Sequence, residues 1–267
     1  MGLVFGGEDF AEYGVVIDSA ETWPKPVRDR KTVHVPGRNG DLILDNYCYQ
    51  NVEITYHCLI KDDWKEKFID FCVMLYQKRG YQELYDDNHP GVYRMAEFAG
   101  PISPELWFTT ETGVFDLIFN CKPQQYISPQ QSYVLDFTTQ DAIALVDNTY
   151  GMAAYPLFRV IGASNGALIT LGETGPYPWY IQIASNNFYG IEIDCEAETC
   201  TAIDEGGAAI ANANSYVTIT PPDSFPIDQR DFPYIGPAIG YQILAAHSHE
   251  GVTYSGTLVI EPRFTRI

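Results

Sequence analysis

Basic residues are scarce in this chain, and they are unevenly distributed. The 267 residues include 16 Lys and Arg against 35 Asp and Glu, which gives a formal net charge of −19 at pH 7. No lysine occurs after Lys122, and no basic residue lies between Arg159 and Arg230. A nucleic-acid-binding surface needs lysine and arginine to displace phosphate counterions, so the composition argues against direct nucleic-acid binding. The asymmetry predicts a domain boundary within residues 123–155.

Long apolar segments are also missing. No run reaches the 18 or so apolar residues of a membrane-spanning helix, and the N-terminus lacks the basic and apolar segments of a signal peptide. We therefore expect a protein made in the cytosol and not inserted in a membrane. Its six cysteines are expected to be free thiols. Cys195 and Cys200 would nevertheless face each other at disulfide distance if Ala197-Glu198 formed a two-residue turn.

Motifs for catalysis and cofactor binding are missing as well. The sequence has no phosphate-binding or dinucleotide-binding glycine loop, no His-Glu-x-x-His and no EF-hand loop. We expect no catalytic residues, no cofactor and no metal. His247 and His249 could share a strand face, but an exposed hairpin tip explains them better. The carboxylates between Asp194 and Glu205 lack the fixed spacing of a calcium site.

The clearest pattern that is present is a β-hairpin within residues 31–45. The segment alternates apolar and polar residues, stops at Pro36-Gly37, turns at Asn39-Gly40 and resumes as a strand from Leu42. An Asn-Gly pair between two alternating segments favours a type I′ turn, because both central positions of that turn need positive φ.

Residues 63–79 carry the one convincing helical pattern. Its apolar face is formed by Trp64, Phe68, Phe71, Cys72 and Leu75 at helical spacing. We expect Asp63 and Glu66 to form a capping box at the start and Gly80 to end the helix. Strand patterns surround it, at Val52–Ile60, Tyr81–Tyr85, Val92–Ala99, Trp107–Thr110 and Val114–Cys121.

From Tyr155 onward, strand patterns recur every eight to twelve residues, which is typical of a β-sandwich. They lie at Leu157–Ile161, Leu168–Leu171, Tyr180–Ala184, Tyr189–Cys195, Tyr216–Thr220, Tyr241–Ala245 and Val252–Ile260. The preceding stretch, Asp141–Tyr150, is expected to be an irregular linker. The expected fold class is therefore all-β with one helix, and the expected domains are residues 1–135 and 136–267.

An aromatic cluster in the second half leaves a second function open. Tyr177, Trp179 and Tyr180 are of the kind that stacks on sugar rings, although a buried strand entry explains them equally well. A glycosidase needs two carboxylates at a set separation, and 35 acidic residues are available. A carbohydrate-binding β-sandwich protein or a glycoside hydrolase is therefore the alternative.

Several segments, taken in order, resemble the distal tail protein (Dit) family of long-tailed, non-contractile phages of Gram-positive hosts. They are Phe5-Gly6-Gly7, the turn Val35-Pro36-Gly37-Arg38-Asn39-Gly40-Asp41, Cys121–Gln125, Tyr155–Gly162, Tyr189–Glu196, Phe232–Pro237 and Leu258–Phe264. The segment Gly236–Gly240 departs from the family's Pro-Gly-x-Asn pattern.

The resemblance implies a structural virion protein and not an enzyme. Residues 1–135 would be a β-sandwich-like domain that forms a hexameric ring at the tail tip, and residues 136–267 a galectin-like β-sandwich. The ring would be the baseplate hub that joins the tail tube to the adsorption apparatus of the virion, and it would be assembled in the host cytoplasm.

The resemblance also implies the partners of such a hub. They are further copies of the chain, the tail tube protein, a tail-associated fibre or lysin, and a receptor-binding protein. DNA would pass through the lumen without sequence-specific binding, and an acidic lumen would repel it. We expect the turn Val35–Asp41 to lie at the subunit interface, because a neighbouring subunit can cover the exposed edges of a hairpin.

Overall fold

The chain folds into two compact units in which strands predominate. A computed structural model describes residues 2–98, 100–107, 112–138, 142–173, 178–222, 232–236, 240–245 and 254–267. The first unit comprises residues 1–128 with Ile267, and the second comprises residues 129–266. Both units are built from antiparallel strands, with a single α-helix among the described residues. The expected all-β class is confirmed.

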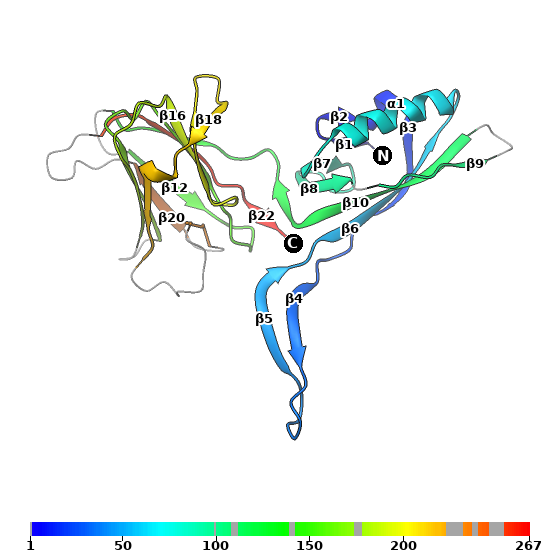
Figure 1. The fold of residues 1–267 in the computed structure, drawn as a ribbon, viewed down its shortest axis with the longest axis horizontal. Helices are drawn as coiled ribbons and strands as arrows, with labels where there is room; N and C mark the ends of the chain where they lie inside the picture. Colours follow the sequence, from blue (N-terminus) through cyan, green and yellow to red (C-terminus); the bar gives the residue numbers. More distant parts are fainter. Residues whose placement is uncertain are drawn as a thin grey trace. The chain divides into compact units, whose positions relative to one another are not determined.

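One sheet organises the first unit, in the strand order β2-β1-β7-β8-β10-β6-β3 (Figure 1). The strands are β1 (Leu3–Phe5), β2 (Glu8–Asp9), β3 (Val15–Glu21), β6 (Val52–Ile60), β7 (Gln82–Asp86), β8 (Val92–Phe98) and β10 (Thr112–Ile127), and β9 (Glu105–Trp107) pairs with β10. A short 3-10 helix, η1 (Phe10–Tyr13), links β2 to β3.

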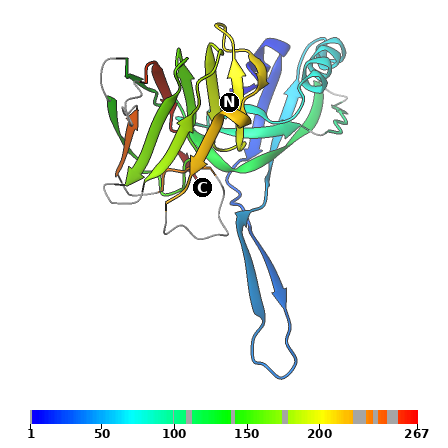
Figure 2. The same ribbon diagram turned by 60° about the vertical axis from the view of Figure 1, so that its left-hand side comes forward.

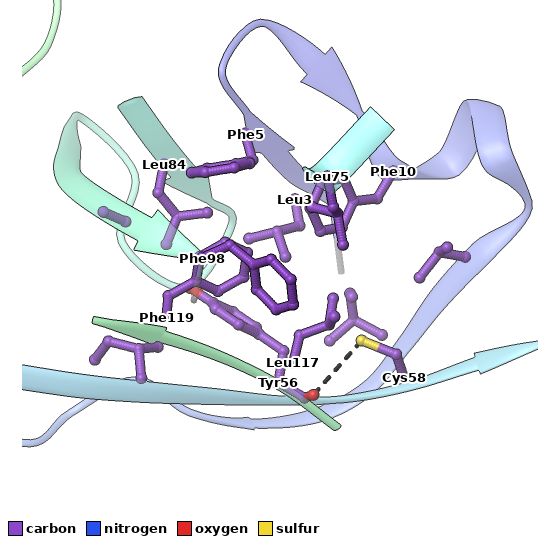
Figure 3. Packing of buried hydrophobic residues seen from close by; sticks show 14 of the residues in the cluster. Leu3, Phe5, Phe10, Tyr56, Cys58, Leu75, Leu84, Phe98, Leu117 and Phe119 are labelled. Carbon is purple, nitrogen blue, oxygen red and sulfur yellow. Dashed lines mark hydrogen bonds between the residues drawn. The ribbon is translucent and has the colours of Figure 1, made fainter. Parts of the chain in front are cut away.

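This sheet is strongly curved, so that its two ends enclose a core. Phe5 on β1 and Phe119 on β10 are three strands apart in the sheet, which would separate them by about 14 Å if the sheet were flat. Their ring centroids are only 4.9 Å apart. Figure 3 shows these rings packed together with Phe98, Tyr56 and Leu84. The curvature gives the first unit the sandwich-like core that the sequence predicts.

Helix α1 (Trp64–Gln77) covers this core. Phe71 and Leu75 of the predicted apolar face are fully buried, and Trp64 and Phe68 pack partly buried against the same cluster. The predicted capping box is wrong. Asp63 has a left-handed backbone (φ 52°) and its side chain makes no capping hydrogen bond, whereas capping requires an extended backbone at this position.

The predicted end of the helix is also wrong. Gln77 is the last helical residue, and the N–H of Lys78 donates to the carbonyl of Leu75 at 3.2 Å. Lys78 is already extended, with ψ 124°. Gly80, with φ 64°, therefore comes two residues after the helix has ended and serves the turn into β7.

Two facing sheets form the second unit, a β-sandwich (Figure 2). The first has the order β11-β21-β13-β16-β17-β18, with β11 (Tyr133–Asp136), β13 (Leu157–Ile161), β16 (Gly190–Asp194), β17 (Thr199–Ile203), β18 (Ala209–Asn212) and β21 (Thr257–Glu261). The second has the order β12-β20-β14-β15-β19, with β12 (Ala142–Asp147), β14 (Ala167–Glu173), β15 (Trp179–Ile183), β19 (Val217–Thr220) and β20 (Gly240–Ala245). A 3-10 helix, η2 (Asn214–Tyr216), and the short strand β22 (Thr265–Arg266) complete the elements.

The stretch expected to be a linker is a strand. Residues Ala142–Asp147 form β12, which pairs along its whole length with β20. Ala144 and Val146 are buried, whereas Ile143 and Leu145 are exposed, so the stretch has the period-two alternation of a half-buried edge strand. The linker interpretation overlooked this alternation because every residue from 142 to 146 is apolar.

The turn after β16 is longer than the one considered for Cys195 and Cys200. The ladder between β16 and β17 ends at the pair Asp194 and Thr199, and Cys200 lies opposite Ile193. Cys195 therefore lies beyond the ladder, in the turn. Both thiols are free and buried, and burial raises the pKa of Cys200 to about 11.

We predict that Phe119→Ala destabilises the first unit by about 3–5 kcal/mol, because Phe119 is fully buried among three aromatic rings and its truncation leaves a cavity. The matched control is Ile118→Ala on the same strand. Ile118 is 49% exposed, so its truncation should cost less than about 0.5 kcal/mol. Amide hydrogen exchange within the first unit during denaturant unfolding measures both. Equal losses for the two variants would contradict the assigned core.

Candidate functional site

A long hairpin projects from the first unit, and it is the candidate assembly surface (Figures 1 and 2). Its strands are β4 (Arg28–Val33) and β5 (Leu42–Tyr49), which form a separate two-stranded sheet. The hairpin predicted around residues 31–45 is therefore present, with longer strands than the sequence pattern indicates. No residue of β4 or β5 is buried.

The tip of this hairpin is not the predicted type I′ turn at Asn39-Gly40. The last strand pair is Val33 with Leu42, which leaves eight residues in the loop. The N–H of Arg38 donates to the carbonyl of Val35 at 3.2 Å across Pro36-Gly37, and Gly37 has φ 82°. Proline followed by a residue of positive φ is the pattern of a type II turn.

The reason for this difference lies in the backbone of the predicted turn. Gly40 has a positive φ (79°), but Asn39 does not, and a type I′ turn needs both. The turn forms instead where Pro36 fixes φ in advance. The expected interface residues Val35, Pro36, Gly37, Arg38, Asn39, Gly40 and Asp41 thus form an extended loop whose side chains are exposed or half-buried.

A two-residue bulge interrupts β5 near the base of the hairpin. Arg30 pairs with Asp45 and Asp29 pairs with Cys48, so Asn46 and Tyr47 have no residue opposite them. Tyr47 has a left-handed backbone (φ 56°), and its side chain is 92% exposed. A bulge of this kind redirects a side chain away from the ladder.

Hydrogen bonds hold the bulge on both strands. One oxygen of the Asp45 carboxylate accepts from the N–H of Tyr47 at 2.8 Å, and the other accepts from the Arg28 guanidinium at 2.9 Å. Asp29 accepts from the side-chain amide of Asn46 at 2.8 Å. These hydrogen bonds lower the pKa of both carboxyl groups, that of Asp45 chiefly through the Tyr47 N–H and then through Arg28, and that of Asp29 chiefly through Asn46.

Apolar side chains lie exposed along the same hairpin. Leu42, Ile43 and Leu44 are 37%, 55% and 47% exposed, and Val27, just before β4, is 65% exposed. A two-stranded sheet without a hydrophobic core is marginal in water, and exposed apolar edges invite pairing with another chain. The hairpin therefore has the composition of a surface that is covered on assembly.

The root of the hairpin is tied to the body of the first unit. The Trp23 ring packs against His89 in a tilted arrangement, with centroids 4.6 Å apart and an interplanar angle of 48°. His89 Nδ1 lies 3.1 Å from the Asp86 carboxylate, which also accepts from the hydroxyl of Tyr56 at 2.9 Å. Because Tyr56 and Asp86 belong to β6 and β7, the root is anchored to the curved sheet.

The face of the curved sheet opposite α1 is acidic. Glu53 on β6 and Glu97 on β8 both flank Asn120 of β10, and their side chains point away from the core. Asp116 on β10 belongs to the same face and lies 2.6 Å from Nδ1 of His57 on β6. The first unit thus carries a charged, open sheet face as well as its projecting hairpin.

The sugar-contact candidates do not share one surface. Trp179 and Tyr180 are neighbours on β15, where successive side chains point to opposite faces; Trp179 is 4% exposed and Tyr180 is 44% exposed. Tyr177 lies outside the described residues. The hollow beside β13 and β16, lined by Val160 and Ile191, has no enclosed room even for a water molecule, whereas ordinary ligand sites measure ~300–1,000 Å³.

The acidic residues of the second unit serve its turns. Asp194 accepts hydrogen bonds from the backbone N–H groups of Glu196 and Ala197, and Asp204 accepts from those of Gly206 and Ala208. Within the described residues, no group of three or more His, Cys, Asp or Glu side chains could hold a metal ion. His247 and His249 lie outside them. No helix in the described part of the chain is long and apolar enough to cross a membrane.

Comparison with solved structures identifies the fold. The Dit protein of phage SPP1, described as a paradigm of the hub adsorption apparatus in phages that infect Gram-positive bacteria, matches with a TM-score of 0.64 at 13% identity, over 99% of this chain and 98% of that one. A chain of the phage p2 baseplate in its activated conformation with Sr matches with a TM-score of 0.51 at 10% identity, over 100% of this chain and 98% of that one. The same baseplate with Ca gives 0.50 at 11% identity, over 97% and 93%.

The chain has a Dit-like fold. The resemblance found in the sequence is therefore confirmed at the level of the fold. No protein-family model and no curated protein sequence matches the chain, which agrees with identities of 10–13% to the solved structures.

The sequence did not indicate the bulge at Asn46 and Tyr47 of the hairpin. The sequence Asp45-Asn46-Tyr47 offers one faint signal, since Asp and Asn commonly bond to the backbone two residues onward. The register that leaves both residues unpaired depends on β4, however, and could not be read from β5 alone.

We predict that the Tyr47 amide reports the ionisation of Asp45. Because the folded-state pKa of Asp45 is lowered, its stabilisation of the bulge is present above the unfolded pKa of about 3.9 and is lost as the pH falls through the lower folded value. In NMR spectra, the Tyr47 amide should lose its downfield shift with a midpoint below 3.9. Asp45→Ala should abolish the transition at Tyr47, while Asp41→Ala at the tip should preserve it. A midpoint at or above 3.9 would contradict the hydrogen bond.

Proposed function

We propose that this chain is a non-catalytic structural hub of a phage tail, located at the tail tip of the virion. The likeness to the phage SPP1 Dit protein over 99% of this chain and 98% of that one carries this proposal, together with two chains of a phage baseplate. Because the match includes both units, the whole chain and not one module corresponds to a hub protein.

The first domain, residues 1–135, forms a hexameric ring in this proposal, with the β4–β5 hairpin at the subunit interface. The hairpin and the body of the first unit are different surfaces, so that the contact between two copies is heterologous, and a heterologous contact closes into a ring when its rotation permits. The exposed apolar residues of β5 support this role, because an assembled ring would bury them.

The ring joins the tail tube to the adsorption apparatus, and DNA passes through its lumen without sequence-specific binding. The acidic open face of the curved sheet, with Glu53, Glu97 and Asp116, supports a lumen that repels phosphate groups. The partners are further copies of the chain, the tail tube protein, a tail-associated fibre or lysin, and a receptor-binding protein. The second domain, residues 136–267, is a galectin-like sandwich that contributes to mounting these partners. The hub is assembled in the host cytoplasm.

The alternative function, carbohydrate binding or glycoside hydrolysis, has less support. Trp179 and Tyr180 do not form one stacking platform, and the carboxylates of Asp194 and Asp204 are occupied by turn hydrogen bonds.

We predict that the purified full-length chain forms a six-fold ring or a pair of stacked rings. Native mass spectrometry should give six or twelve times the 30.0 kDa of one chain, and negative-stain electron microscopy should show a central opening. A chain that stays monomeric at all concentrations and cleaves oligosaccharides would overturn the hub in favour of the glycosidase.

A further inference from the structure

We infer that the bulge of β5, with Tyr47 at its outermost point, is the anchor through which one copy of the chain docks on a neighbouring copy. This inference rests on the proposed function and deepens it, because it moves the decisive contact from the tip of the hairpin to its base. The occupant of the surface around Tyr47 is a second copy of this chain.

The conformation of Tyr47 is the first argument. A left-handed backbone is energetically unfavourable at a residue that carries a side chain, and it persists where the surroundings impose it. Here Asp45 holds the Tyr47 N–H at 2.8 Å, and Asp29 holds the adjacent Asn46. The isolated chain gains no burial from this strain, because 92% of the Tyr47 side chain is exposed to solvent.

The second argument is that the bulge presents Tyr47 in a form suited to binding. Interface residues that contribute most to affinity are enriched in tyrosine, tryptophan and arginine and are held in place before binding. Arg28 donates to both Asp45 and the Tyr49 hydroxyl, which fixes the strand on either side of Tyr47. The exposed apolar side chains of Val27, Ile43 and Leu44 lie on the same hairpin, with Ile43 and Leu44 on its opposite faces, so a neighbouring copy that wraps the hairpin would cover them together with the anchor.

The third argument is charge, and it identifies the partner. Residues 25–49 contain five basic and three acidic residues, whereas the rest of the chain contains 11 basic and 32 acidic residues. The hairpin is thus a net-positive segment in a strongly acidic protein. Another copy of the chain presents the acidic surface that complements it, and such complementarity favours association and sets the register.

The first test is Tyr47→Ala in the full-length chain. We expect the concentration at which half of the rings dissociate, measured by mass photometry on dilution, to rise at least tenfold. The matched control is Tyr76→Ala, which removes an exposed tyrosine (57%) from helix α1 and should leave that concentration within twofold of the wild type. Equal thermal melting of both variants shows that the fold is intact.

The second test concerns charge. Arg30→Glu with Lys31→Glu reverses two exposed cations of β4 and should raise the half-dissociation concentration at least tenfold in low salt. Lys61→Glu with Lys65→Glu makes the same change in net charge at exposed positions outside the hairpin and should have less than a threefold effect. Added salt should weaken the wild-type ring.

The third test identifies the occupant directly. With Tyr47 replaced by the photoreactive residue p-benzoylphenylalanine, irradiation of assembled rings should give a product of twice the chain mass. Cross-linking only to a different tail protein, or rings unaffected by Tyr47→Ala, would overturn the anchor while leaving the hub intact. A wild-type chain that does not self-associate would overturn the ring and the anchor together.

Discussion

The alternation of buried and exposed side chains along β6 and β10 is the constraint on which the first unit depends. These two strands pair over nine residues, and every second residue of the pair is buried, with Tyr56 and Leu117 completely so. Because only one face can be covered by α1 and by the curled ends of the sheet, the other face remains open. Its polar and charged side chains therefore follow from the same alternation that builds the core, and they form the acidic face that we propose lines the lumen.

The β4–β5 hairpin, in contrast, packs its apolar side chains against no core of its own chain. Its strands satisfy each other's backbone groups, but its apolar residues find no core and its bulge holds Tyr47 in a strained conformation. Hydrogen bonds of exposed aspartates order this segment, but its apolar side chains stay in contact with solvent. A neighbouring subunit would stabilise it by burying them. The assembly interface that we propose supplies that burial, and it links a local backbone irregularity to the formation of a ring.

Ion pairs across one sheet and an apolar core between the two sheets stabilise the second unit. Arg159 at the centre of its six-stranded sheet bonds to Glu192 and Glu261 on the two flanking strands, each at 2.7 Å, while apolar residues fill the space between the sheets. Proteins with this fold share only 10–13% of their residues with this chain. The fold therefore depends on where apolar and polar residues are placed, and many different residue types can fill those positions.

The sequence by itself determined the all-β class, the hairpin and the apolar face of α1, because period-two and helical alternations follow from backbone geometry alone. The resemblance to Dit proteins was also present in the sequence, in the order of its segments. The tertiary structure decided where β12 lies, how α1 is capped and which residues bulge from β5. Two of these depend on a partner distant in the sequence, β20 for Ala142–Asp147 and β4 for Tyr47, whereas the helix start depends on the left-handed backbone at Asp62 and Asp63. A local pattern carries no information about the register of its partner, so the bulge that we propose as the anchor became visible only when the two strands were paired.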